Sequence, residues 1–227
     1  MIIVRNLYKS FKTGNTELTV LKDLELEVKT GEFVSITGRS GSGKSTLLYQ
    51  LGLLDHPNSG FIEIDGIDIL KLDRKQRTDF RLNELGYVFQ DYALIPELTA
   101  IENIAVPLLM QGLSIKEAKK KSFTALERMG LENRENNLPS QLSGGEQQRI
   151  SIARAISHNP KVLFADEPTA NLDSETADSV LKAFLELHKE GQTIVMVTHE
   201  PEYAELTERI LVLSDGKIST DRKTKNK

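Results

Sequence analysis

The stretch "TGRSGSGKST" at residues 37–46 has the residue types and spacing of a phosphate-binding loop: Gly, four residues, then Gly-Lys-Ser. Glycines let the backbone point successive N–H groups at one anion. Lys44 can place its ammonium on the β- and γ-phosphates of a nucleotide, and Ser45 can offer its hydroxyl to Mg²⁺. We therefore predict a phosphate loop formed by Gly38, Arg39, Ser40, Gly41, Ser42, Gly43, Lys44, Ser45 and Thr46.

Two carboxylates stand at the end of "VLFADE", residues 162–167, directly after four apolar residues. A strand over the apolar residues would present them at its carboxyl end, where ligands bind in open α/β sheets. We predict that Asp166 holds Mg²⁺ and that Glu167 orients or deprotonates the attacking water. By itself such a pair is more often a feature of the surface, and its pairing with the phosphate loop favours function.

A second pair of glycines begins the stretch "GGEQQRISIARA" at 144–155. Ser143 and Glu146 frame the glycines as a capping box, so an ordinary helix start is one interpretation. The other is a second phosphate contact, because two glycines cost helix stability and let a ligand approach the backbone at a helix N-terminus. The capping box supports the first interpretation, and the two consecutive glycines tip the balance towards the second.

These residues need strands and helices to position them. A buried strand over 32–38 leads into the phosphate loop and a helix follows over about 44–53, while 24–28 and 61–66 alternate as half-buried strands. Residues 71–135 are charged and amphipathic, which is typical of helices, and we interpret them as part of a helical subdomain inserted into an α/β body.

The second half alternates helices with strands, which predicts a parallel sheet. The expected elements are a helix from Gly144 to about Ser157, a strand over 162–166, a helix over 174–189, a strand over 193–199 and a hairpin that turns at Asp215-Gly216.

The composition excludes several classes. The chain has 227 residues, 39% of them hydrophobic and 27% charged, as expected of a globular protein. Its net charge of −4 argues against a nucleic-acid binder, and the absence of cysteine excludes disulfides and Cys-ligated metal sites. No apolar run approaches the roughly 20 residues of a spanning helix. Any membrane part must therefore come from another chain.

Six stretches taken together resemble the ATP-binding cassette (ABC) family of ATPases over nearly the whole chain. They are "GRSGSGKS" at 38–45, Gln90 in "VFQDYALIP", "LSGGEQQR" at 142–149, "VLFADEP" at 162–168, "ANLD" at 170–173 and "VTHE" at 197–200. The resemblance implies one domain with a P-loop NTPase core and parallel sheet, an N-terminal antiparallel β subdomain and an inserted helical subdomain. The core would span about 1–70 and 160–227. The helical subdomain would span about 71–158 and would contain "LSGGEQQR", the signature stretch of the family.

The resemblance also assigns roles. Phe11 stands where the family places an aromatic that stacks on adenine, although Tyr is commoner there and Tyr8 is a rival. Gln90 would coordinate Mg²⁺ and link the core to the helical subdomain. Asp173 would lie at a dimer seam, and His199 would contact the γ-phosphate of ATP.

The family pairs two cassettes head to tail, which implies a homodimer with two composite sites. Ser143, Gly144 and Gly145 of one copy would cap the γ-phosphate bound by the loop of the other. ATP would hold the dimer closed, and hydrolysis would open it.

The stretch "DYALIPELTAIENIAVPL" at 91–108 resembles the branch of lipoprotein-release, macrolide-export and cell-division ATPases. Such a chain would be soluble when isolated and peripheral at the cytoplasmic face of the membrane, bound to a separate permease that moves a lipoprotein, peptide or drug. Its alternative role is a mechanical switch on a membrane partner. Four apolar residues would line a groove for that partner or simply pack the subdomain: Leu98, Ile101, Ile104 and Val106.

Other classes fit less well. Chromosome-type ATPases carry long coiled coils between the phosphate loop and the signature, and this chain has no sustained heptads there. Ribosome-associated relatives normally join two cassettes in one chain. Nucleotide kinases and GTPases would lack "LSGGEQQR" and His199.

Overall fold

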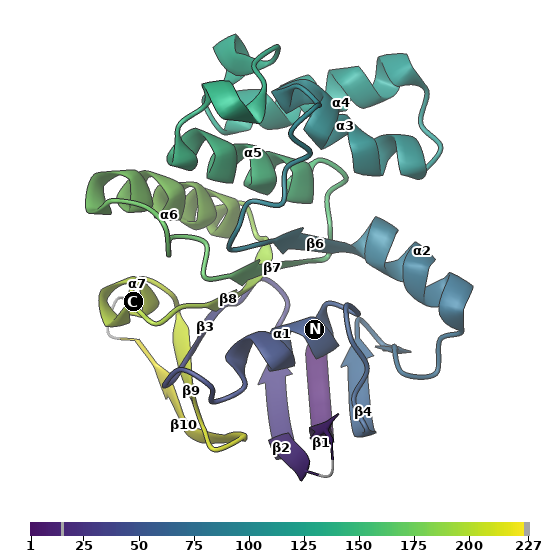
Figure 1. Ribbon diagram of the computed structural model, residues 1–227, viewed down its shortest axis with the longest axis vertical. Helices are drawn as coiled ribbons and strands as arrows, with labels where there is room; N and C mark the ends of the chain where they lie inside the picture. Colours follow the sequence, from purple (N-terminus) through teal and green to yellow (C-terminus); the bar gives the residue numbers. More distant parts are fainter. Residues whose placement is uncertain (15, 225–227) are drawn as a thin grey trace. The chain divides into compact units, whose positions relative to one another are not determined.

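The computed structural model describes residues 1–14 and 16–224. Contacts between residues divide the chain into two compact units. Figure 1 labels the helices and strands of the chain. Unit 1 comprises Met1–Thr78 and Gly191–Lys227, and unit 2 comprises Asp79–Glu190. The predicted bounds of the helical subdomain, about 71–158, stay a prediction.

Unit 1 contains an antiparallel sheet at its N-terminal end. Its strands lie in the order β2 (Thr16–Val28), β1 (Ile2–Thr13), β4 (Ser59–Ile64) and β5 (Ile67–Asp68). Ile2 lies opposite both Val28 and Ile64, and all three side chains are fully buried. The alternation of apolar and polar residues therefore places one face of the sheet in the core, and both predicted strands of this region are confirmed.

The other strands of unit 1 surround β3 (Phe33–Thr37), which runs parallel to β8 (Thr193–Val197) on one side and to β9 (Arg209–Ser214) on the other. β8 is buried along its whole length and β3 nearly so, in keeping with their mostly apolar sequences, "TIVMV" and "FVSIT". β10 (Lys217–Lys223) pairs antiparallel with β9 across the predicted Asp215-Gly216 turn. The helices α1 (Lys44–Leu51) and α7 (Pro201–Ala204) complete this part.

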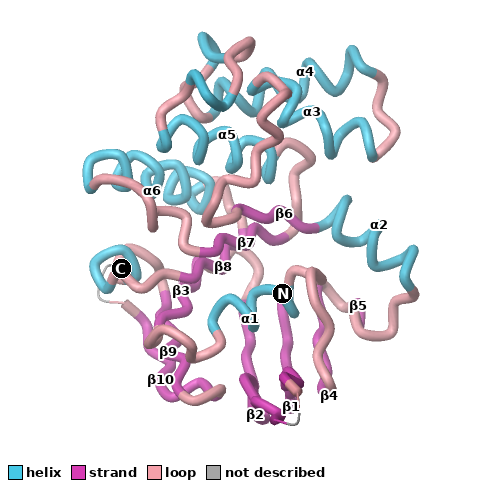
Figure 2. The backbone as a smooth tube through the Cα atoms, in the orientation of Figure 1, coloured by secondary structure: helices cyan, strands magenta, loops and turns pink. Residues whose placement is uncertain are grey.

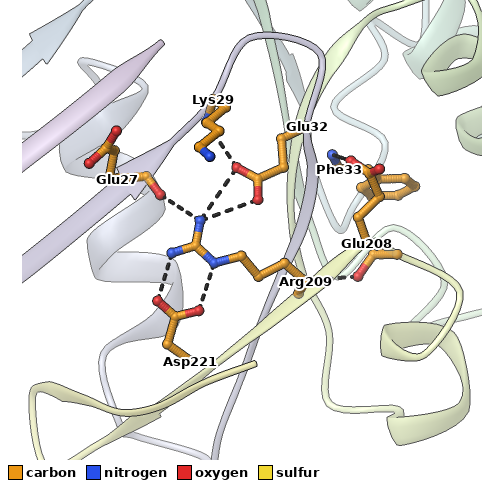
Figure 3. A network of polar contacts seen from close by, with 8 residues as sticks. Glu27, Lys29, Glu32, Phe33, Glu208, Arg209 and Asp221 are labelled. Atoms are coloured by element: carbon orange, nitrogen blue, oxygen red, sulfur yellow. Dashed lines mark hydrogen bonds and ion pairs between the residues drawn. The ribbon is translucent and has the colours of Figure 1, made fainter. Parts of the chain in front are cut away.

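Arg209 joins four strands or strand starts in unit 1 (Figure 3). Its guanidinium donates two hydrogen bonds of 2.6 Å to the carboxylate of Asp221 on β10. A third nitrogen donates to the carbonyl of Glu27 on β2 at 2.9 Å and to the carboxylate of Glu32, just before β3, at 3.2 Å. The carboxylate of Glu32 also accepts the backbone N–H of Lys29 at 2.9 Å. This network fixes the start of β3, the strand that leads to the phosphate loop.

Unit 2 is mostly helical, as the cyan segments of Figure 2 show. Its two strands, β6 (Leu85–Val88) and β7 (Val162–Asp166), pair in parallel. The helices are α3 (Ala100–Met110), α4 (Ile115–Arg128), α5 (Gly144–Ile156) and α6 (Ser174–Lys189), with 3₁₀ turns η1 (Glu132–Arg134) and η2 (Pro139–Gln141). α2 (Arg74–Glu84) runs across the division between the units.

Capping boxes begin three of these helices. In each, a Ser or Thr accepts the N–H of a Glu three residues on, and that Glu accepts the N–H of the capping residue. The pairs are Thr99 with Glu102, Ser114 with Glu117 and Ser143 with Glu146. Local sequence therefore determines where the helices of unit 2 begin.

Candidate functional site

The phosphate loop of unit 1 connects β3 to α1, as the sequence predicts. Gly38, Gly41 and Gly43 have φ of 148°, 75° and 102°, a region that side chains disfavour. A Cβ at Gly38 would lie 2.2 Å from the carbonyl oxygen of Leu213 and 2.9 Å from Oγ of Ser42. The backbone can therefore fold this tightly only with glycine at that position.

The loop offers donors to an anion. α1 begins without any side-chain capping bond, and the buried Oγ of Ser42 has no hydrogen-bond partner. Lys44 is 7% exposed, and its ammonium donates to the carbonyls of Gly38 at 3.1 Å and Arg39 at 3.2 Å. An uncapped helix N-terminus beside a buried cation and an unpartnered hydroxyl suits a phosphate group. The residues present thus fit a nucleotide's phosphates.

His199 lies at the same end of the sheet as the phosphate loop. Ile36 on β3 pairs with Val197 on β8, and the backbone N–H of Thr198 donates to the carbonyl of Ile36 at 3.2 Å. The His199 side chain is 51% exposed, with Nε2 3.0 Å from a carboxylate oxygen of Glu200. Adjacent carboxyl ends of parallel strands therefore bring His199 and the loop to one edge of unit 1.

Phe11 lies on β1 opposite Leu18 on β2, and its side chain is 42% exposed. The same hairpin contacts the phosphate loop, because a Cβ at Gly43 would meet Val20 at 3.0 Å and Leu21 at 3.1 Å. The ammonium of Lys9 lies over the Phe11 ring, 4.7 Å from its centroid. Tyr8, the other candidate for stacking on adenine, is similarly exposed at 39%.

Unit 2 places Gln90 and Asp166 near each other at the ends of paired strands. Val88, the last residue of β6, lies opposite Ala165 on β7, so Gln90 and Asp166 follow on the same side. Asp166 is 4% exposed. Carboxylate and amide oxygens suit Mg²⁺, whereas no cluster of three His, Cys, Asp or Glu among the described residues could hold a metal unaided. Ser45 lies in unit 1, and its convergence with this pair stays a prediction.

Glu167 has a left-handed backbone, with φ of 44°. Non-glycine residues rarely adopt this conformation, and those that do cluster at functional sites. Its carbonyl accepts the N–H of Ala170 at 3.1 Å, which closes a tight turn directly after β7. The chain therefore changes direction at Glu167, immediately after Asp166 ends β7.

Ser143 and Glu146 form the predicted capping box at the start of α5. Ser143 Oγ accepts the N–H of Glu146 at 3.3 Å, and Glu146 accepts the N–H of Ser143 at 2.8 Å. The bond from the Ser143 backbone is the main reason that the pKa of Glu146 is lowered, and a bond from Arg134 adds to it. The interpretation of this stretch as a capped helix start is confirmed.

The two glycines of α5 also have a packing reason within the chain. A Cβ at Gly145 would lie 2.1 Å from Cγ2 of Thr176 on α6, and one at Gly144 would lie 2.9 Å from the hydroxyl of Tyr92. Close approach, which we expected from a ligand, is thus observed from neighbouring side chains. The phosphate contact of the stretch stays a prediction.

Asp173 is the N-cap of α6. Its carboxylate accepts the backbone N–H of Thr176 at 3.0 Å and the Thr176 hydroxyl at 2.7 Å, and these two bonds lower its pKa. Because the methyl of the same threonine faces Gly145, the starts of α5 and α6 share one contact residue.

Arg154, which is not among the predicted site residues, holds the segment after Gln90. Its guanidinium donates to the carbonyls of Tyr92, at 2.9 Å, and Ala93. Tyr92 and Ala93 both have positive φ, 59° and 50°. Burial lowers the pKa of Arg154 to about 10, so it remains charged at neutral pH. A lone arginine within a helix carries no sequence signal for such a role.

Comparison with known proteins agrees with this geometry. A family model described as ABC transporter matches residues 21–170. The lipoprotein-releasing system ATP-binding protein LolD of Aquifex aeolicus is 52% identical, over 88% of this chain and 89% of its own length. The macrolide export ATP-binding/permease protein MacB of Bartonella quintana is 46% identical, over 99% of this chain but 34% of its own length.

A solved structure of the ATP-binding cassette MJ0796, a dimer bound to ADP and Pi, has a TM-score of 0.92 and 41% identity, covering 100% of both chains. This likeness confirms the predicted fold class, a nucleotide-binding cassette with parallel and antiparallel sheets. Among the described residues, no helix combines the length and apolar character needed to cross a membrane. The chain belongs to the ABC transporter family and is an ATP-binding ATPase of that family.

Proposed function

We propose that this chain is the ATP-hydrolysing subunit of a transporter and that ATP pairs two copies of it into composite sites. The observation that carries the proposal is the Asp166-Glu167 pair at the end of β7, where Glu167 is held in a left-handed turn. One carboxylate can serve a metal and the other can face water.

The phosphate loop binds the β- and γ-phosphates through its backbone N–H groups and Lys44. Phe11 stacks on the adenine base. Ser45, Gln90 and Asp166 are the residues that would hold Mg²⁺, which neutralises charge on the phosphates when it is bound.

Hydrolysis needs an oriented water. Glu167 accepts a hydrogen bond from this water and takes its proton as the oxygen bonds to the γ-phosphorus. The bond from that phosphorus to the oxygen shared with the β-phosphate breaks, and ADP and phosphate are the products. His199 contacts the γ-phosphate from the adjacent strand end. Each residue acts on a different atom of one in-line displacement.

The second copy completes the site. Ser143, Gly144 and Gly145 of that copy face the γ-phosphate, so ATP is bonded from both sides and the pairing is isologous. Asp173 lies at the seam. Loss of the γ-phosphate removes the bridge and opens the dimer. The dimeric MJ0796 structure bound to ADP and Pi supports this pairing by similarity.

Opening and closing of the dimer changes the conformation of a membrane permease, to which the dimer binds at the cytoplasmic face of the membrane. The names of the relatives support such a partner, since LolD belongs to a lipoprotein-releasing system and MacB joins an ATP-binding part with a permease. The transported molecule is a lipoprotein, peptide or drug. The alternative is a mechanical switch, and a pull-down from native membranes that recovers a permease supports the transporter.

Glu167→Gln tests the proposal directly. The variant keeps the shape of the side chain but cannot accept a proton, so we expect ATP to bind without turnover and to trap a dimer. Size-exclusion chromatography with ATP and Mg²⁺ measures the dimer, and phosphate release measures turnover. Glu25→Gln, an exposed position on β2, is the matched control and should behave like the wild type. A Glu167→Gln chain that stays monomeric, or that hydrolyses ATP at the normal rate, contradicts the assignment.

A further inference from the structure

Lys9 is a buried lysine on β1, beside the aromatic residue that we assign to adenine. It is 8% exposed. Its ammonium lies 2.7 Å from the carboxylate of Asp55, donates to the carbonyl of His56 at 2.6 Å and lies over the ring of Phe11. A buried ammonium is costly unless it is paired and hydrogen-bonded, and these contacts supply both requirements. The same contacts also fix the position of the Lys9 ammonium.

Asp55 is itself held by two further donors. Gln50 Nε2 donates to one carboxylate oxygen at 3.0 Å, and the backbone N–H of His56 donates to the other at 2.7 Å. Burial alone would raise the pKa of Asp55, but the bonds from Lys9, His56 and Gln50 outweigh it and lower that pKa. Asp55 is therefore a carboxylate at neutral pH, and its charge complements that of Lys9.

These contacts connect the ring to the helix behind the phosphate loop. Gln50 is fully buried on α1, the helix that begins at Lys44. A continuous path of polar contacts thus runs from α1 through Gln50, Asp55 and Lys9 to the Phe11 ring. The position of the ring is coupled to the element that positions the phosphates.

The ring remains open to a ligand. The register of β1 and β2 shifts between Lys9 and Ser10, and the ammonium of Lys9 lies over the Phe11 ring, which places the two side chains on the same side of the strand. Lys9 pairs with Leu21, which contacts the phosphate loop at Gly43. The side chain of Phe11 nevertheless stays 42% exposed. The lysine thus covers part of the ring while a large part faces solvent.

We propose that Lys9 is a positioning residue for the nucleotide base, which it orders by holding one face of Phe11 so that the other face stacks on adenine. The proposal rests on the role of Phe11 in the proposed function. Phenylalanine lacks the hydroxyl by which a tyrosine could be anchored, so contacts with the ring itself must orient it. A ring that is already oriented loses less freedom when the base binds.

The charge of Lys9 also favours stacking. The faces of aromatic rings are electron-rich, so two rings stacked directly repel each other electrostatically. A cation on one face attracts π-electron density and makes the opposite face less negative. Lys9 therefore assists the base through both orientation and charge.

The test compares the binding of ADP with that of inorganic pyrophosphate by calorimetry, in the presence of Mg²⁺. Both probes lack the γ-phosphate that bridges two copies, and only ADP carries a base. We expect Lys9→Met to weaken the affinity for ADP about fivefold and to leave the affinity for pyrophosphate within about twofold of the wild-type value. Lys9→Arg keeps a cation on the ring and should retain ADP affinity within about twofold.

Two further variants separate the possible causes. Lys12→Met removes the same charge from an exposed neighbour on β1 and should change neither affinity by more than about twofold. Phe11→Ala should weaken the binding of ADP and leave the binding of pyrophosphate unchanged. Adding Lys9→Met to Phe11→Ala should cost at most about a further twofold, because the lysine acts through the ring.

The outcomes are distinct. Weakening of ADP and pyrophosphate by equal factors in Lys9→Met overturns the proposal, because a general electrostatic or folding effect would then explain the loss. A normal ADP affinity in Lys9→Met, with a loss in Phe11→Ala, overturns the role of Lys9 and leaves that of Phe11 intact. No loss in Phe11→Ala overturns both roles, whereas dimer formation by Glu167→Gln tests the ATPase proposal separately.

Asp55→Asn provides a second route should Lys9→Met fold poorly. The Asp55 side chain is 36% exposed, and the change keeps Lys9 but removes its charged anchor. We expect ADP to bind about threefold more weakly and pyrophosphate to be unaffected. An unchanged ADP affinity in this variant also overturns the proposal.

Discussion

At the scale of single residues, Arg209 shows what distinguishes a structural ion pair from a surface one. Its side chain is 17% exposed and that of Glu32 is 14% exposed, so neither charge is well hydrated. The hydrogen bonds to Asp221 are the main reason that the pKa of Arg209 is raised, although burial opposes them. The guanidinium also satisfies the carbonyl of Glu27. Removing it would leave several acceptors in unit 1 without their donor.

We expect Arg209→Met to lower the free energy of unfolding by about 2 kcal/mol, since it leaves the carboxylate of Glu32 partly buried and without this cation. Arg222→Met is the matched control. Arg222 pairs with Glu205, but their side chains are 45% and 41% exposed, so the loss should be much smaller than that of Arg209→Met. Urea unfolding followed by far-UV circular dichroism measures both. Equal losses would show that exposure does not govern these pairs.

The site residues that could be predicted from the sequence are those whose spacing along the chain forms a recognisable motif. The phosphate loop was predictable because glycine spacing and the Lys-Ser pair reflect backbone geometry and ligand charge, and Asp166 because a buried strand precedes it. Arg154 and Lys9 were not predictable. Each is a cation within an ordinary helix or strand, and its partners come from segments that only the fold brings close.

At the scale of elements, the start of α5 combines two requirements. The capping box of Ser143 was evident in sequence because both partners lie within four residues of each other. The need for glycine at 145 was not, because it arises from Thr176 about thirty residues later. The helix expected after the phosphate loop is present as α1, but it ends at Leu51 rather than at about residue 53.

Gly145→Ala should lower the free energy of unfolding by about 1–2 kcal/mol, because the new methyl would overlap Cγ2 of Thr176. Thr176→Ser removes that methyl but keeps the hydroxyl that bonds Asp173. Alone it should cost at most about 0.5 kcal/mol, and together with Gly145→Ala it should recover most of the loss. Chemical denaturation of the four chains completes a double-mutant cycle. Simple additivity of the two changes would contradict the contact.

At the scale of the whole molecule, the chain carries a phosphate loop in unit 1 and a signature helix start in unit 2. Head-to-tail pairing predicts that these two never serve the same ATP. Two defects placed on different chains would then fall in one composite site of a heterodimer, and the other site would be intact. A chain that used its own signature would have no intact site.

Mixing two inactive chains tests this expectation. Glu167→Gln lacks the residue assigned to proton transfer, and Ser143→Arg places a bulky cation at an exposed helix start. Each chain alone should hydrolyse ATP at no more than about a hundredth of the normal rate. Their equimolar mixture should turn over well above either, measured as phosphate release. Activity equal to the mean of the two separate chains would refute sites shared between copies.

The hydrogen bonds from Arg154 to the carbonyls of Tyr92 and Ala93 have a consequence for the conformation of this segment. The two left-handed residues store strain of about 1 kcal/mol or more each, which the hydrogen bonds from Arg154 offset. Without those bonds the left-handed conformations of Tyr92 and Ala93 would lose the contacts that offset their cost. Arg154 therefore helps to hold the segment after Gln90 in one conformation.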